Sequence, residues 1–148
     1  MYSFRNAILS DVDSIAYVHV TSWQETYTGL LDDSVIGNFD IENRKKMWSS
    51  FLQKEMSSQR VYVAVHSDKI VGIASWSVTS DHVELVTLYV LSEFQHQGIG
   101  TGLFRQVENN ATEREKPLIV WVLEGNNSVV FYEKMGLQLK QRELKKIG

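Results

Sequence analysis

The sequence contains Leu85-Val86-Thr87-Leu88-Tyr89-Val90 and, a few residues later, Gln95-His96-Gln97-Gly98-Ile99-Gly100-Thr101-Gly102. The first run is apolar and β-branched, which is typical of a buried strand. Glycines in the second run allow the backbone to approach another molecule closely. An amphipathic run from Thr101 to Ala111 then predicts a helix. A strand, a glycine turn and a helix N-terminus direct free N–H groups at one point, which predicts a site for phosphate oxygens.

The glycine spacing excludes two well-known phosphate loops. A Walker loop requires Gly-Lys-Ser/Thr, but Gly100 is followed by Thr101-Gly102. A dinucleotide fingerprint requires Gly or Ala three places beyond its second glycine, where this chain has Leu103. The remaining pattern, Gln-x-x-Gly-x-Gly after Leu-Tyr-Val, resembles the acetyl-CoA pyrophosphate loop of the histone-acetyltransferase-related N-acetyltransferase superfamily, abbreviated GNAT.

A second segment carries the same resemblance. The family has an apolar strand, an Asn, and a helix containing Phe-Tyr-x-Lys-x-Gly-Phe/Leu. This chain has the run 118–127, ending in Asn126-Asn127, and then Phe131-Tyr132-Glu133-Lys134-Met135-Gly136-Leu137. The run 18–30 also looks like the first helix and loop of many bacterial members. Two departures stand out: the asparagines are one or two residues closer to the tyrosine than usual, and only twelve residues follow Gly136.

Length and composition limit the kind of protein. The 148 residues predict one domain, 1–148, and 43% hydrophobic with 22% charged residues is typical of a globular protein. There is no cysteine, which excludes disulfides and thiolate chemistry. The formal net charge of −3 disfavours a nucleic-acid surface. Without an apolar signal core or a long apolar run, we expect a cytoplasmic protein with no membrane contact. The histidine spacing suggests no metal.

The order of the predicted elements indicates an α/β (α+β) domain of three layers, with a central mixed β-sheet and helices on both faces. Pro117 is the only proline in the sequence, and no linker or repeat divides the chain. We expect strands at 2–7, 60–66, 70–79, 82–91, 117–123 and 137–144, and helices at about 11–20, 41–56, 101–111 and 128–135, the last closed by Gly136.

The resemblance implies how the cofactor is held. The amides between Gln97 and Thr101 would bond the pyrophosphate of acetyl-CoA, and the backbone of Leu88 to Val90 would pair with its pantetheine arm. An N–H near Leu88 or Tyr89 would polarise the thioester carbonyl. Core packing of these side chains is compatible with that role. The expected cofactor-binding residues are Leu88, Tyr89, Val90, Gln95, His96, Gln97, Gly98, Ile99, Gly100, Thr101, Asn126 and Asn127, with either asparagine able to serve as a helix cap instead.

Acetyl transfer to an amine requires a base and benefits from an acid. Alternate residues of a strand share a face, so Glu84 is expected on the face of Val86 and Leu88, where it falls on the catalytic Glu position of the histone acetyltransferase branch. A solvated carboxylate, His82 as the base, or a water chain are the alternatives. By resemblance, the phenol of Tyr132 lies near the cofactor sulfur as a general acid; the alternative is core packing.

The segment expected to cover the acceptor has a less specific sequence pattern. By resemblance, Trp23, Glu25 and Tyr27 lie in the segment that covers the acceptor, and two aromatic rings with a carboxylate suit an amine. Core packing for Trp23 and solvent for Glu25 are equally compatible. The sequence therefore predicts an N-acetyltransferase that moves acetyl from acetyl-CoA to a primary amine of a small molecule, amino acid or peptide by direct attack in a ternary complex. The alternative is a non-catalytic acyl-CoA sensor or interaction module. The shortened C-terminus also predicts a homodimer.

Overall fold

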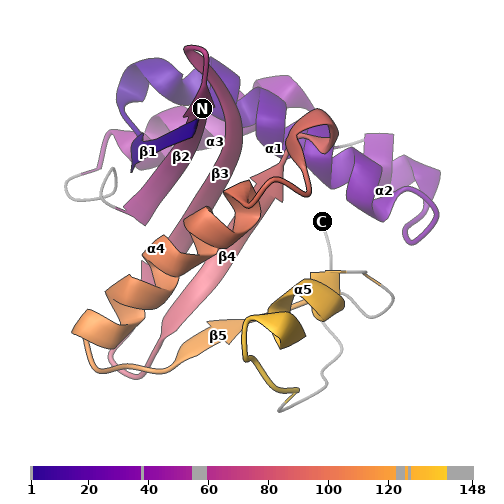
Figure 1. The fold of residues 1–148 in the computed structure, drawn as a ribbon. Coiled ribbons are helices and arrows are strands. Elements are labelled where there is room, and N and C mark those ends of the chain that lie inside the picture. Colours follow the sequence, from indigo (N-terminus) through magenta and orange to yellow (C-terminus); the bar gives the residue numbers. More distant parts are fainter. Residues whose placement is uncertain (1, 38, 55–59, 123–125, 127, 140–148) are drawn as a thin grey trace.

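A five-stranded mixed sheet forms the centre of the protein (Figure 1). The computed structural model describes residues 2–37, 39–54, 60–122, 126 and 128–139. The first four strands are antiparallel neighbours in chain order, and the fifth lies parallel to the fourth at the edge. The mixed sheet predicted from the sequence is therefore confirmed. The strands are β1 (Tyr2–Asn6), β2 (Val61–His66), β3 (Lys69–Val78), β4 (Val83–Val90) and β5 (Leu118–Val120).

Helices cover both faces of the sheet, as expected. Helices α1 and α3 pack against one face, and α4 crosses the other, where α5 joins it (Figure 1). Among the described residues, none of the helices has the length and apolar character that a membrane crossing requires. The helices are α1 (Val12–Tyr27), α2 (Asp33–Gly37), α3 (Ile41–Leu52), α4 (Ile99–Glu113) and α5 (Ser128–Lys134), with short 3₁₀ turns at Leu9–Asp11 and Ser92–Phe94.

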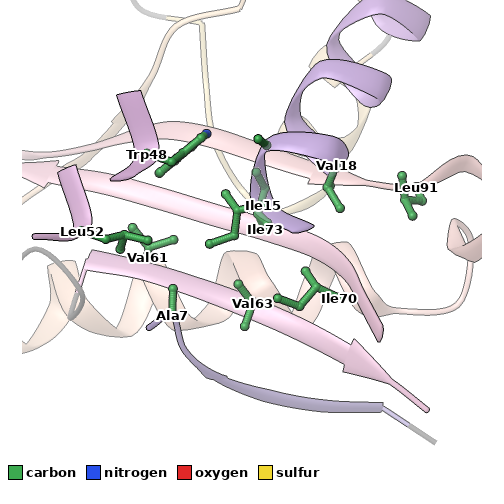
Figure 2. Packing of buried hydrophobic residues seen from close by; sticks show 11 residues of the cluster. Ala7, Ile15, Val18, Trp48, Leu52, Val61, Val63, Ile70, Ile73 and Leu91 are labelled. Carbon is green, nitrogen blue, oxygen red and sulfur yellow. The ribbon is translucent and has the colours of Figure 1, made fainter. Parts of the chain in front are cut away.

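In the core on the α1 side, the apolar faces of the helices pack against the sheet. Figure 2 shows Ile15 and Val18 from α1 and Trp48 from α3 over Val63 and Ile73 of the strands. All five side chains are nearly or fully buried. Burial of each such side chain stabilises the fold by roughly 1.5–3 kcal/mol. This cluster fixes the position of α1, whose last turns reach the candidate site.

The core on the opposite face holds α4 against the middle strands. Its fully buried side chains include Leu103, Phe104 and Val107, at the helical spacing expected for this segment. Gly102 faces β1, because a Cβ at this position would lie 2.5 Å from Cζ of Phe4. The absence of a side chain at Gly102 therefore serves the packing of α4 on β1 rather than the room for a phosphate.

Two expected strands differ from the structure. β5 covers only Leu118–Val120, because its parallel pairing with β4 ends at Leu85↔Val120. Residues 137–139 form no strand, and the rest of that expected strand lies outside the described residues. An alternating pattern indicates which side of a strand is apolar but supplies no neighbouring strand to pair with. In the described part of the chain β5 has one strand neighbour, and the expected homodimer stays a prediction.

Candidate active site

A β-bulge in β4 sets the geometry of the site. Ser75 of β3 pairs with Thr87, and the next residue, Trp76, pairs with Leu85, so Val86 is an extra residue on β4. An extra residue reverses the alternation of faces along a strand. The expectation that Glu84, Val86 and Leu88 share a face is therefore wrong. Leu85 and Leu88 both belong to the core on the α4 side, and Glu84 falls on the opposite face.

The sheet opens at the same place. Pairing between β4 and β5 stops at Leu85↔Val120, while β4 continues to Val90. In the described part of the chain, no strand covers this edge of β4 beyond Leu85, and the Val86 side chain is 60% exposed. An open strand edge presents unpaired N–H and C=O groups. Such an edge can pair with an amide-rich ligand, and the expected pairing with the pantetheine arm of acetyl-CoA stays a prediction.

The glycine loop follows directly behind β4. Gly98 is the residue before α4 and has a φ of +85°, a conformation in which a side chain would be strained. The first helical bond runs from the Gly102 amide to the Gly98 carbonyl, so the amides of residues 99–101 have no partner within the helix. Gln95 ties the loop to the sheet, because its Nε2 donates to the Val90 carbonyl at 2.9 Å. These free amides are a cradle of the kind that pyrophosphate requires.

Not every expected loop residue faces the cavity next to this loop. Gln95, His96, Gly98, Gly100 and Thr101 line it, as do Leu88 and Val90 of β4. Gln97 is exposed outside it. The Ile99 side chain is 1% exposed and belongs to the core, so only its amide is available to a ligand. Asn126 lines the cavity and also caps α5, since its Oδ1 accepts from the Ser128 amide at 2.9 Å; Asn127 lies outside the described residues.

Replacement of Gly100 by aspartate is expected to weaken acetyl-CoA binding by at least about tenfold. The new carboxylate would stand in the cavity and repel the pyrophosphate. A Cβ at Gly100 would meet only ordinary contacts, 3.8 Å from the Phe131 ring and 3.9 Å from Val90, so the variant should fold. Gly100→Ala is the matched control and should lose much less affinity. Calorimetric titration with acetyl-CoA measures both, and unchanged affinity in folded Gly100→Asp would reject the loop assignment.

Three phenols interact near the point where β4 and β5 separate. Tyr132 of α5 lines the cavity, and burial raises the pKa of its phenol, with a further rise from the nearby Tyr27. Burial also raises the pKa of Tyr89, and a hydrogen bond to Tyr27 adds to the rise. Tyr132 packs with the α4-side core, whereas Tyr27 and Tyr89 belong to the α1 side. Because β4 and β5 have separated, side chains from both faces of the sheet can meet here.

Glu84 does not line the cavity. Its side chain is one-third exposed, and its Oε1 lies 3.7 Å from Nε2 of His82. The bulge directs it to the face of β4 that carries Thr87 and Tyr89. Any proton transfer from an acceptor in the cavity to Glu84 would therefore pass through water.

The last turns of α1 form another wall of the cavity, through Ser22, Glu25, Thr26 and Thr28. Of the three expected acceptor residues, only Glu25 lines it. The Trp23 ring stacks on Phe39 with centroids 4.1 Å apart and planes 8° apart, and it contacts Tyr27 at 4.9 Å. Trp23 and Tyr27 thus pack together outside the lining, and the phenol of Tyr27 interacts with Tyr89 and Tyr132.

His19 is a buried group that the sequence analysis did not single out. Trp48 Nε1 donates to its Nδ1 at 3.1 Å, so a neutral His19 carries its proton on Nε2. Burial, together with the charge of Arg44, lowers the pKa of His19 to about 4. The ring packs against Phe39 and Tyr89. His19 is a neutral part of the wall that positions Tyr89.

This pKa shift predicts a pH dependence of stability. From the ordinary value of about 6.5 down to about 4, the unfolded chain binds a proton that folded His19 does not. The free energy of unfolding should therefore fall as pH falls through this window, by on the order of 3 kcal/mol, and then level off. His19→Gln keeps an acceptor for Trp48 and should remove most of this slope. Urea unfolding at a series of pH values tests it, and equal slopes in both proteins would contradict the prediction.

All these walls enclose one cavity of about 820 Å³, which extends from the glycine loop along β4 to α1 and α5. Among the described residues that line it there is no lysine or arginine, and Glu25 is the only carboxylate. In the described lining, the groups suited to a phosphate are therefore the loop amides, together with the dipole of α4.

Comparison with known proteins now gives the class. A family model described as the acetyltransferase (GNAT) domain matches residues 32–148. The chain belongs to the GNAT family, and the resemblance found in the glycine loop and the Phe-Tyr-x-Lys segment is confirmed. The family moves acetyl from acetyl-CoA to nitrogen, so the chain is an acetyl-CoA-dependent N-acetyltransferase.

Individual relatives support this assignment. An uncharacterized N-acetyltransferase of Bacillus subtilis, YuaI, is 31% identical over 90% of this chain and 78% of its own length. A spermidine N(1)-acetyltransferase of Thermoplasma acidophilum is 21% identical over 94% of this chain and 89% of its own. The crystal structure of PaiA N-acetyltransferase from Thermoplasma acidophilum in complex with coenzyme A superposes with a TM-score of 0.86, at 20% identity, over 97% of this chain and 93% of that one. This similarity confirms the GNAT fold.

Proposed function

We propose that the protein acetylates a primary amine of a small molecule, an amino acid or a peptide N-terminus, by direct attack of the amine in a ternary complex. One observation carries the proposal: a single cavity joins the free amides of the glycine loop, the open edge of β4 and the end of α1. A cofactor held along the glycine loop and the edge of β4 would place its acetyl group beside the end of α1. Both substrates can therefore occupy the site together, with no covalent enzyme intermediate needed.

The chain's own residues would hold acetyl-CoA as follows. Amides of residues 99–101 bind the pyrophosphate, and the edge of β4 from Leu88 to Val90 pairs with the pantetheine arm. An amide near Leu88 or Tyr89 polarises the thioester carbonyl. Acetyl-CoA supplies an acetyl group activated as a thioester. In the transfer, the amine nitrogen forms a bond to the acetyl carbon, the carbon–sulfur bond breaks, and one proton passes from the amine to solvent while another reaches the sulfur.

Two side chains move these protons in the proposed mechanism. Glu84 accepts the proton of the amine through water, because the carboxylate lies outside the cavity on the opposite face of β4. A water chain that reaches bulk solvent without Glu84 is the alternative. Tyr132 donates to the departing sulfur, because it lines the cavity and its phenol carries its proton at neutral pH.

Release of free CoA thiol, followed over a panel of amines, tests the proposal. Turnover with at least one primary amine is expected, with mass detection of the acetylated product. The amines acted on by two similar proteins, a spermidine N(1)-acetyltransferase and an aminoglycoside N-acetyltransferase, make small amines the first choice for the panel. Binding of acetyl-CoA without turnover on any amine would instead favour a non-catalytic sensor.

A further inference from the structure

The α1 wall of the cavity is polar and lies on one face of the helix. Ser22, Glu25 and Thr26 are three and four residues apart, so their side chains share a face. The Thr26 hydroxyl donates to the Ser22 carbonyl at 2.8 Å, and the Thr28 hydroxyl donates to the Gln24 carbonyl at 2.6 Å. The proton of each threonine hydroxyl is thus engaged by the helix, while its oxygen can still accept a hydrogen bond. Among the described lining groups of α1, the Ser22 hydroxyl and the Glu25 carboxylate make no such bond.

The Ser22 hydroxyl is buried without a partner. Its residue is 5% exposed, it lines the cavity, and its Oγ has no hydrogen bond within the described part of the chain. A buried hydroxyl without a partner destabilises the folded state. The residue lines the cavity although the oxygen itself has almost no accessible surface, so a rotation of this short side chain toward the cavity would let a ligand group donate a hydrogen bond to it.

The charge of this wall is negative. Glu25 is exposed to the cavity and makes no ion pair with any described residue, and none of the described lining residues is lysine or arginine. The wall is also the C-terminal end of α1, which carries partial negative charge from its last carbonyls. A ligand nitrogen bound here would be favoured in its protonated form.

We propose that the acceptor is an amine with a second, cationic nitrogen, which Glu25 and Ser22 bind while the first nitrogen is acetylated. This inference rests on the proposed function and specifies its substrate class. The reacting nitrogen must lose its proton before it attacks. A fixed carboxylate beside it would stabilise the protonated form, which cannot react. The charge of Glu25 is matched instead by a nitrogen that stays protonated. Acceptors with a carboxylate in that place, such as free amino acids, would be repelled.

A matched pair of acceptors tests the proposal. 1,4-Diaminobutane and n-pentylamine have the same number of non-hydrogen atoms and differ in the second charge. We expect kcat/KM to favour the diamine by about tenfold or more. Glu25→Gln should raise KM for the diamine by at least about fivefold and leave that for n-pentylamine nearly unchanged. Added salt should raise KM for the diamine in the wild type but much less in Glu25→Gln.

Two further variants separate recognition from structure. Ser22→Ala removes a hydroxyl without a partner, so it should raise KM for the diamine by about twofold or more without lowering the unfolding midpoint. Glu42→Gln removes a carboxylate from α3, away from the cavity, and should leave both KM values unchanged. A stability loss in Ser22→Ala with unchanged KM would make Ser22 a structural residue and overturn its part.

The proposal and the proposed function fail in different ways. Equal kcat/KM for the two amines in the wild type, or equal losses for both in Glu25→Gln, would overturn the second-cation subsite while acetyl transfer stands. No turnover with any amine would reject the proposed function. In that case calorimetric titration of the CoA-loaded protein with 1,4-diaminobutane decides the subsite: binding that Glu25→Gln weakens supports it, and no binding overturns it.

Discussion

Tyr132→Phe is expected to lower turnover by about 10²-fold or more, with acetyl-CoA affinity nearly unchanged. The substitution keeps the ring and removes only the hydroxyl. The ring packs against Phe104 and Phe131 at centroid distances of 6.2 and 5.3 Å, so the core on the α4 side should be preserved. Tyr132 lines the cavity, and in the proposed mechanism the loss of its hydroxyl would leave the departing thiolate without a proton donor.

The pH profile distinguishes this role from simple packing. Raising the pH should not rescue Tyr132→Phe, because the leaving group still lacks its proton. Turnover against pH with one good acceptor amine measures the effect. Tyr62→Phe is the matched control, since Tyr62 stacks on Phe4 in the sheet and does not line the cavity. Near wild-type turnover in Tyr132→Phe would remove Tyr132 from the mechanism and leave it a core residue.

Glu84→Gln is expected to lower turnover most at neutral pH, by about 10²-fold, and high pH should partly restore it. An alkyl-ammonium has a pKa of about 10.4, so at high pH more of the acceptor is already neutral and turnover depends less on Glu84 as a base. Glutamine has nearly the same shape as glutamate, so the packing beside His82 should change little. The opposite pH responses of the two variants are the sharpest test of the proposed mechanism.

A control variant and two contradicting results test the role of Glu84 as a base. Glu113→Gln removes an exposed carboxylate at the end of α4 and should behave as wild type. A loss in Glu84→Gln that does not depend on pH would make Glu84 a positioning residue. Unchanged turnover at every pH would assign the proton transfer to a water chain that does not involve Glu84.

Local patterns were sufficient for most of the fold. The apolar spacing of Leu103, Phe104 and Val107 predicted the inner face of α4, and Gly136 closes α5 with a φ of +98°, as expected for a residue after a helix. Such features depend on neighbours within a few positions. The expected strand at 137–144 had a suitable alternation, but residues 137–139 have no strand to pair with in the described structure.

The candidate site was predicted in part. The glycine loop and Tyr132 could be named from the sequence because each lies in a continuous motif, and the structure brings both to one cavity. The interaction of Tyr27 with Tyr89 and Tyr132 was missed, although each of the three residues was named for another role. Ser22 was also missed. Its only signal was its spacing from Glu25 on a helix, which does not show that its hydroxyl is buried without a partner.

The sequence by itself determined most of the elements and the loop between β4 and α4, because hydrophobic period, glycine placement and helix ends act over a few residues. Only the tertiary structure decided which way Glu84 points. The two-residue period of a strand holds only while pairing is regular, and the bulge at Val86 arises from how β4 pairs with Ser75 and Trp76 of β3. The meeting of Tyr27 with Tyr132 likewise depends on the separation of β4 from β5, which contacts far apart in the chain impose.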